Sequence, residues 1–297
     1  MTPAFVGTHG LWGIVRPMSV PLPHPAPTSN VSGHEPILAI FSDLALELAS
    51  STLQGCAEAL APHSRYLTLL PLHAVTADTV HALRPCAILT VGSLQDLPGS
   101  RQALQAANIP VVETWSSPIC ARDCVVAPDN DHAGRLAAQH LAARGHKRVA
   151  CVSGSSSWDT ERRQGFLTQA RQLELEISAE IVQHDVRGVP DGRTAMLKLL
   201  ATQTIFDAVF CTNDQLTIGV VSEAHDRELV IPLDLAVLGC SDTGTAIQSI
   251  PGLSAIRTDA IDLGRRAGAM LMDRLTGQQP MGLISHMPSW LETHRST

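Results

Sequence analysis

Short apolar runs alternate with amphipathic stretches along the chain, and this pattern predicts alternating strands and helices. In the first block, buried strands are predicted at 37–41, 66–70, 86–91 and 111–114, with helices at 45–61, 76–83 and 100–107. A second block repeats the pattern, with strands at 148–152, 180–183, 207–211 and 235–238 and helices at 161–173, 192–202, 214–227 and 260–275. Because strand–helix–strand order produces parallel sheets, we expect two similar α/β lobes.

Polar residues stand where several of these helices begin. Asn130 or Asp131 suits the N-cap of a helix that Gly145 ends, and Thr258 or Asp259 suits the N-cap of the last helix. Short polar side chains cap helices because their oxygens accept free backbone N–H groups of the first turn. These helices therefore have start signals of their own.

Composition fits this pattern. One Tyr, five Phe and four Trp leave a core of Ala, Val, Leu and Ile, which is typical of parallel sheets covered by helices. A net charge of −7 with scattered Lys and Arg argues against a nucleic-acid interface on this chain. Residues 1–35 are rich in Pro and Gly, so we expect a disordered or extended lead. No apolar run is long enough for a membrane span and the start is a poor signal peptide, so we expect a cytoplasmic protein with no membrane partner.

Signals for catalysis and metal binding are absent from the sequence. The seven cysteines lie singly in apolar surroundings, and Cys120 and Cys124 have no second pair nearby, so we expect no metal site. Gly154 and Ser155 follow a strand, but the glycine of a nucleophile elbow is missing. No phosphate-binding loop occurs. We therefore expect neither a cofactor nor an enzyme.

One segment carries more functional information than any other. The apolar run 206–211 ends in Asn213 and Asp214, which open a predicted helix. In open α/β sheets, ligands lie beyond the carboxyl ends of strands, where such side chains converge. Either the pair only caps the helix, or it also contacts a ligand.

Two arginines follow another strand. We predict Arg162 and Arg163 in the first turn of a helix, where a cation opposes the helix dipole. A guanidinium there suggests a ligand carboxylate or hydroxyl cluster, although pairing with Asp159 or Glu161 is the alternative. Further candidates share positions at strand or helix ends: Ser42, Asp43, Thr90, Trp115 and Trp158. A tryptophan beside hydroxyl donors can stack on a sugar ring, but a lone one is more often part of the core.

Several segments together resemble one family. They are 109–115 (IPVVETW), 128–149 (PDNDHAGRLAAQHLAARGHKRV), 161–166 (ERRQGF), 210–219 (FCTNDQLTIG) and 251–256 (PGLSAI). Their order and spacing resemble the effector domain of LacI/GalR repressors, nearest to the gluconate-repressor branch, over residues 37–297. The resemblance implies a periplasmic-binding-protein-like fold with two Rossmann-like lobes joined by three crossover strands. The lobes implied are 36–128 with 258–286, and 129–257 with 287–297.

The resemblance also assigns residues. The family's effector-contacting arginine falls on Arg162, and the asparagine of its Asn-Asp motif on Asn213, with Asp214 beside it. Trp115 stands where the family often has Asp, and Ser241, followed by Asp242, replaces a carboxylate that commonly holds sugar hydroxyls. Losing that charge while keeping Arg162 favours an acidic sugar such as an aldonate. Asn213 is the expected contact and Asp214 the expected cap or second contact.

The implied function is effector binding and dimerisation in a sugar-responsive regulator of sugar or gluconate catabolism. Its partners would be a sugar or sugar-acid effector, a second copy of the chain, and DNA only if a helix-turn-helix head is supplied, since residues 1–35 do not resemble one. Either a start-site or frame disruption has removed the head, or a headless relative acts by binding ligand or by co-assembling. The alternative function is a solute-binding protein of an ABC sugar transporter, which shares the fold.

Overall fold

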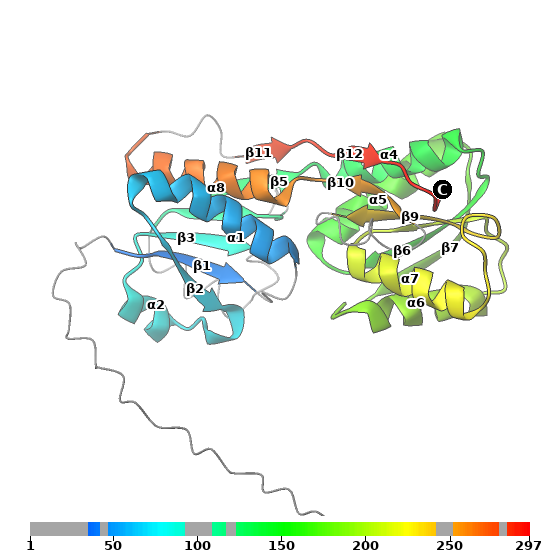
Figure 1. The fold of residues 1–297 in the computed structure, drawn as a ribbon, viewed down its shortest axis with the longest axis horizontal. Helices are drawn as coiled ribbons and strands as arrows, with labels where there is room; N and C mark the ends of the chain where they lie inside the picture. Colours follow the sequence, from blue (N-terminus) through cyan, green and yellow to red (C-terminus); the bar gives the residue numbers. More distant parts are fainter. Residues whose placement is uncertain (1–34, 42–46, 93–108, 117–122, 242–251, 279–283) are drawn as a thin grey trace, which may run out of the picture. The chain divides into compact units, whose positions relative to one another are not determined.

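The computed structural model describes residues 35–41, 47–92, 109–116, 123–241, 252–278 and 284–297. Within these residues the strands form two six-stranded sheets (Figure 1). The first has the order β11-β5-β4-β3-β1-β2, with β1 Ile37–Phe41, β2 Leu67–Pro71, β3 Ala87–Val91, β4 Val111–Thr114, β5 Cys124–Pro128 and β11 Ile284–Met287. The second has the order β12-β10-β9-β8-β6-β7, with β6 Arg148–Gly154, β7 Glu176–Gln183, β8 Ala208–Cys211, β9 Ala236–Ser241, β10 Ser254–Arg257 and β12 Trp290–Glu292. All strand pairs are parallel except β10 with β12.

Helices cover both faces of each sheet. The first sheet packs against α1 (Glu47–Leu60) and α8 (Ala260–Leu275) on one face and α2 (Ala77–Leu83) on the other. The second packs against α4 (Asn130–Ala143) and α5 (Ser157–Gln172) on one face and α6 (Val189–Ala201) and α7 (Asp214–Asp226) on the other. Two 3₁₀ turns, Ala61–His63 and Leu72–Ala74, follow α1 and β2.

The continuous apolar runs in the sequence follow from this double cover. In β1, Ile37 and Ala39 contact the cluster beneath α1 and α8, whereas Leu38 and Ile40 contact the cluster beneath α2. Successive strand side chains point to opposite faces, so a strand buried on both faces needs apolar residues at every position. The prediction of two α/β lobes, each built on a mostly parallel sheet, is confirmed.

The chain passes between the two sheets three times. The connections lie between β5 and α4, between β10 and α8, and between β11 and β12. Two of them touch, because the Thr258 and Ser289 hydroxyl oxygens lie 3.0 Å apart. Of the earlier expectations, the lead up to residue 34, the helix at 100–107, and Ser42, Asp43 and Asp242 lie outside the described residues.

Several element boundaries were predicted wrongly. Asp129, rather than Asn130 or Asp131, caps α4, because its side chain accepts the His132 N–H. Four strands were not predicted, namely β5, β10, β11 and β12. Of these, β10, β11 and β12 carry polar residues beside their apolar ones, so they lack the continuous apolar run of β1 or β8.

Three helix pairs meet through glycines, namely α1 with α8, α4 with α5 and α6 with α7. A Cβ added to Gly55 in α1 would lie 1.9 Å from the carbonyl oxygen of Ile261 in α8, and one added to Gly264 would lie 2.0 Å from that of Thr52. In the second lobe, a Cβ on Gly134 in α4 would lie 1.9 Å from the carbonyl oxygen of Arg162 in α5. The helix backbones therefore touch, and no side chain fits between them.

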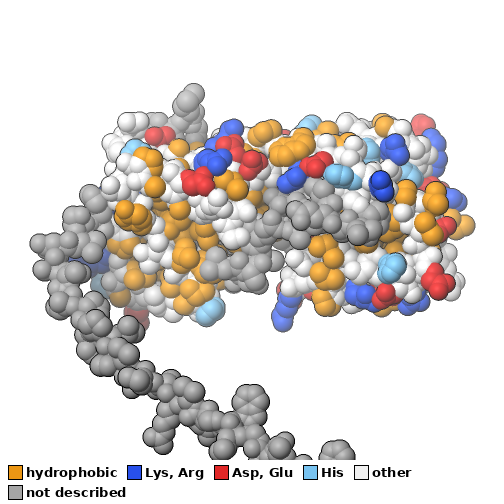
Figure 2. Space-filling model, in the orientation of Figure 1, with side chains coloured by type: hydrophobic (Ala, Val, Ile, Leu, Met, Phe, Trp, Pro, Cys, Tyr) orange, Lys and Arg blue, Asp and Glu red, His pale blue; other side chains and the backbone are white. Residues whose placement is uncertain are grey.

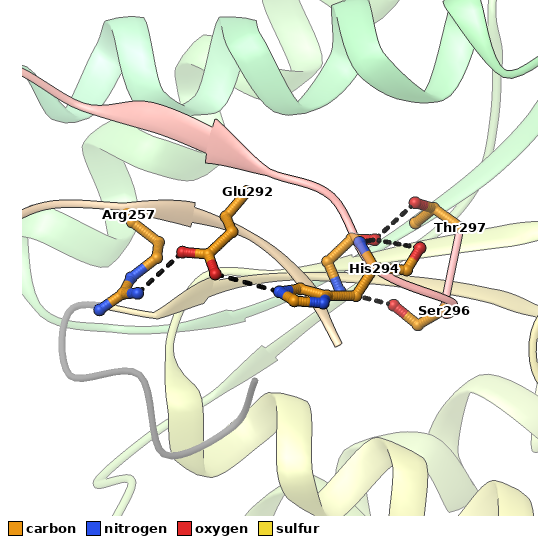
Figure 3. Close-up of polar contacts among 6 residues, drawn as sticks. Arg257, Glu292, His294, Ser296 and Thr297 are labelled. Carbon is orange, nitrogen blue, oxygen red and sulfur yellow. Dashed lines mark hydrogen bonds and ion pairs between the residues drawn. The ribbon is translucent and has the colours of Figure 1, made fainter. Parts of the chain in front are cut away.

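Residues 294–297 complete the second lobe beside β9 and β10 (Figure 3). The Ser296 hydroxyl donates to the Val237 carbonyl oxygen at 2.6 Å and accepts the Ser254 N–H at 2.8 Å. The Val237 N–H in turn donates to the Ser296 carbonyl oxygen at 2.8 Å. Nearby, Arg257 donates to Glu292, which also contacts His294. Ser296 thus satisfies backbone groups that would otherwise be buried without partners.

His140 joins this tail to α4. Its Nε2 atom lies 2.8 Å from the Thr297 hydroxyl oxygen, and Arg144 donates to the Thr297 carbonyl oxygen at 2.9 Å. Burial, and then the positive charges of Arg144 and His146, hold the pKa of the His140 imidazole below its ordinary value. The folded protein therefore favours neutral His140.

Replacing Gly264 with Ala should destabilise the protein more than replacing Gly268. Both changes gain the same helix propensity, about 1 kcal/mol, because both residues lie inside α8. At Gly264 the new Cβ meets the Thr52 carbonyl oxygen at 2.0 Å, whereas at Gly268 the nearest atom is the Ala59 Cβ at 2.8 Å. We expect Gly264→Ala to cost roughly 1–3 kcal/mol in urea unfolding. Equal losses for the two variants would contradict backbone contact at Gly264.

His140 should make stability fall in mild acid. Its folded pKa lies below the unfolded value, so the unfolded state takes up the proton first and the stabilisation is lost as pH falls from about 6.5 through the folded pKa. Urea unfolding of wild type and His140→Gln at a series of pH values should give a stability difference that shrinks toward low pH. Glutamine keeps a hydrogen-bonding group near Thr297, so it serves as the neutral reference. A difference that does not change with pH would contradict this linkage.

Candidate functional site

The described polar side chains at the carboxyl ends of β6 and β8 form a connected network. Ser156 caps α5 just after β6, and Asn213 caps α7 just after β8. Between them, the Thr212 hydroxyl oxygen accepts the Gly154 N–H at 3.3 Å. Because β6 and β8 are neighbours in the sheet, both strand-to-helix corners open at the same edge.

Asp159 ties these two corners together. It is 4% exposed, and its carboxylate accepts the Ser156 hydroxyl at 2.7 Å and the Asn213 side-chain amide at 3.0 Å. The Thr212 hydroxyl donates to the same carboxylate oxygen as Asn213. A buried carboxylate costs free energy unless donors surround it, and here three donors from two corners do so.

Arg162 lies at the same edge and is only 1% exposed. Its Nε donates to the Asn130 side-chain oxygen at 2.9 Å, and its Nη1 donates to the Thr212 carbonyl oxygen at 2.9 Å. Its guanidinium carbon stands 5.3 Å from the centre of the Trp158 ring. These contacts hold the planar guanidinium in one orientation, which favours recognition of a ligand by its N–H groups.

The expected position of Arg162 in its helix was wrong. Helix α5 begins at Ser157, not at 161, so Arg162 lies in the second turn and the argument from the helix dipole does not apply. The earlier start has a local cause, because the Ser156 hydroxyl accepts the Asp159 N–H at 3.2 Å. Arg163 points elsewhere and pairs with Glu180, so the two neighbouring arginines have different surroundings.

Asn213, rather than Asp214, is the cap of α7. Its side-chain oxygen accepts the Leu216 N–H at 3.0 Å, while Asp214 is the first helical residue. A negative charge in the first turn is favourable for the helix dipole, which explains an Asp at that position. The role of Asn213 as a ligand contact stays a prediction, but its cap role is now fixed.

Trp115 connects the first lobe to this edge. It follows β4, is 1% exposed, and its indole N–H donates to the Thr52 hydroxyl on α1 at 2.9 Å. Its ring meets the Trp158 ring edge-on, with centroids 6.1 Å apart. Trp115 therefore belongs to the core of the first lobe in this structure, and its ring packs against the Trp158 ring.

The remaining candidates lie apart from this network or outside the described residues. Thr90 at the end of β3 is buried, and its hydroxyl donates to the Gly92 carbonyl oxygen at 3.0 Å. Ser241 is buried at the end of β9. Ser42, Asp43 and Asp242 are not described. The structure thus brings Arg162, Trp158 and Asn213 together, with Trp115 against Trp158.

Sequence reasoning missed four members of the network, namely Asn130, Ser156, Asp159 and Thr212. A signal existed for Asp159, since Ser156 and Asp159 have the spacing of a capping box. Asn130 and Thr212 gave no comparable signal. Their importance arises from Arg162, which is 32 and 50 residues away from them in sequence.

The buried cysteines do not resemble nucleophiles. Burial raises the pKa of the Cys56 thiol to about 12 and that of Cys211 further still. A thiol must lose its proton to react, so these groups act as small apolar side chains.

Among the described residues, no three His, Cys, Asp or Glu side chains are placed to hold a metal ion. The described helices also include none long and apolar enough to cross a bilayer.

Comparisons with known proteins agree with this architecture. Residues 138–297 match the periplasmic binding protein-like domain family. The repressor PurR of Haemophilus influenzae is 29% identical over 175 residues, covering 57% of this chain and 51% of that protein. The regulator GntR of Pseudomonas aeruginosa is 30% identical over 200 residues, covering 67% of this chain and 58% of that protein. The chain thus spans little more than half the length of these curated relatives.

A solved structure of a dimeric Lac repressor has the same fold. Its TM-score is 0.77 at 22% identity, over 88% of this chain and 98% of that one. This likeness concerns the fold, whereas the sequence matches concern the family. The chain belongs to the periplasmic binding protein-like domain family, and its effector domain is of the LacI/GalR type.

Proposed function

We propose that this chain is the effector-binding module of a LacI-type transcriptional regulator, and that it takes a sugar or sugar acid at the carboxyl ends of β6 and β8. The observation that carries the proposal is the placement of Arg162. This cation is buried at a strand-end edge, is fixed by Asn130 and Thr212, and lies next to the Trp158 ring. A fixed, desolvated guanidinium binds hydroxyl or carboxylate oxygens more strongly than one in water.

The surrounding residues suit a polyhydroxylated ligand. Trp158 is partly exposed and offers an aromatic surface, while Asn213 and Arg162 offer N–H donors at the same edge. Hydroxyl and carboxylate oxygens both accept such donors. We favour an aldonate, such as gluconate, because a guanidinium fork matches a carboxylate and because Ser241 brings no charge of its own to the second lobe.

The regulatory step would follow from the connections between the lobes. Three chain segments join the two sheets, so a ligand that binds one arrangement of the lobes better than another shifts the population toward it. We propose that the effector acts in this way and that two copies of the chain pair to transmit the change. DNA would be contacted by a helix-turn-helix head supplied in addition to this domain. A transporter function is less favoured, because the curated relatives reported above are a repressor and a regulator.

On the face of the molecule displayed in Figure 2, basic and acidic side chains are interspersed. Among the described residues, ion pairs link Arg265 with Glu58 and Arg266 with Asp262. Nucleic-acid interfaces concentrate positive charge on one face, so this face does not suit DNA.

A thermal-shift screen tests the proposal. D-gluconate, D-glucose and D-glucitol differ in charge at one end of a similar polyol, so they separate a sugar acid from neutral sugars. A ligand present at about 100 times its Kd should raise the melting temperature by roughly 5 °C or more. We expect D-gluconate to do so. A rise with D-glucose but none with D-gluconate would sink the sugar-acid preference, and no rise with any sugar or sugar acid would sink the proposed function.

Arg162 has a matched control in its neighbour. Arg162→Lys keeps the charge but loses the fork held by Asn130 and Thr212, and we expect affinity to fall about tenfold or more. Arg163→Lys lies on the same helix and faces Glu180, so it should bind like wild type. Isothermal titration of both variants checks this. If the two variants lost effector affinity equally, Arg162 would not be a ligand-binding residue.

A further inference from the structure

The side-chain amide of Asn213 has a fixed orientation. Its oxygen accepts the Leu216 N–H at 3.0 Å, and its nitrogen donates to the Asp159 carboxylate at 3.0 Å. Turning the amide over would bring two donors together at one end and two acceptors together at the other. Among the described residues, the second proton of the Asn213 amide has no acceptor, so it is available to a bound molecule.

We propose that Asp159 is a positioning residue of the effector site, which holds Asn213 so that it meets the effector as a hydrogen-bond donor. The group of the effector at this point is then an acceptor oxygen, such as a carboxylate, carbonyl or hydroxyl oxygen. This inference rests on the proposed function, because it concerns the same edge of the second sheet. It specifies that Asn213 donates to the effector, whereas the sequence alone does not decide between donor and acceptor.

A carboxylate is the side chain that this position requires. Ser156, Thr212 and Asn213 all donate to Asp159, two of them to one oxygen. An asparagine at 159 offers a single acceptor oxygen and places an NH₂ group against some of these donors. The Asp159 carboxylate contacts neutral donors, namely two hydroxyls and one amide. Charge-assisted bonds are about twice as strong as neutral ones, which explains how one side chain can fix three others.

The backbone leaves space for this carboxylate. A Cβ added to Gly154 would lie 2.2 Å from Asp159 Oδ2 and 3.4 Å from the Asn213 side-chain nitrogen. The carboxylate therefore rests directly on the Cα of Gly154 at the end of β6. Gly154→Ala should displace Asp159 while Asn213 and Arg162 keep their identities. This variant gives a second way to test the proposal.

Swapping the amide and the carboxylate between residues 159 and 213 distinguishes an effect on effector binding from an effect on the stability of the fold. Asn213→Asp keeps a good cap for α7 but places two carboxylates side by side, so we expect a lower melting temperature at neutral pH that recovers in acid. In Asp159→Asn with Asn213→Asp, the amide of residue 159 donates to the carboxylate of residue 213, and the melting temperature should return toward that of wild type. The donor facing the effector is then absent. Asp262→Asn is the matched control, since Asp262 also lies three residues after a helix cap but on an exposed surface.

Titration with D-gluconate, D-glucose and D-glucitol gives the decisive readout. We take the probe that binds the wild-type protein. The double variant should bind this probe at least about tenfold more weakly than wild type despite its recovered stability, while Asp262→Asn should bind it normally. Gly154→Ala should also weaken binding. Wild-type affinity in the double variant, or a double variant less stable than Asn213→Asp, would overturn the inference.

A ligand-free measurement keeps this test separate from the proposed function. In ¹⁵N-correlated spectra, the Asn213 amide, assigned by its loss in Asn213→Asp, should show one proton shifted by the Asp159 bond. That shift should vanish in Asp159→Asn and persist in Asp262→Asn. If none of the three probes binds wild type, the proposed function fails while this measurement still decides the role of Asp159. If the shift of the Asn213 amide proton did not change in Asp159→Asn, Asp159 would not position Asn213, even if the probes bind.

Discussion

Burial of both sheets on both faces is the constraint on which the rest of the structure depends. Helices cover each side of β1 and β6, so the interior positions of these strands hold apolar side chains, and the polar residues of β6 lie at its ends. A polar group in the middle of such a strand would lack partners and would cost free energy. The network around Arg162 and Asp159 therefore lies where the fold permits it, at the edge where β6 and β8 end.

The two buried charges of this edge are stabilised in different ways. Arg162 is held by oxygen atoms of Asn130 and Thr212, and Asp159 by hydroxyl and amide donors. Thr212 serves both, since its carbonyl oxygen accepts from Arg162 while its hydroxyl donates to Asp159. A single residue between β8 and α7 thus couples the cation to the anion. Such shared partners make the energetic effects of substitutions non-additive.

The sequence predicts the elements of this fold better than the contacts of its site. Long periodic segments such as α8, and apolar runs such as β1, appear at their predicted positions because local pattern determines them. The start of α5 was misplaced by four residues because Ser156 caps it through Asp159. Arg162 and Asn213 were identified from a resemblance and from their place after strands, but the partners that orient them come from distant segments. No local pattern reports a contact between Arg162 and Asn130, since only the packing of α4 against α5 creates it.

The path of the chain has a consequence for the order in which the protein is made. The first sheet needs β11, which follows α8, and the second sheet needs β12 and the Ser296 and Thr297 contacts that come later still. Neither lobe can finish folding while its last strand is still in the ribosome. Domains made from one continuous segment fold as they emerge, whereas here each lobe must wait for a strand that follows α8 in the chain. During synthesis, the open edges of β5 and β10 stay unpaired longest, so the two lobes reach their final form almost together.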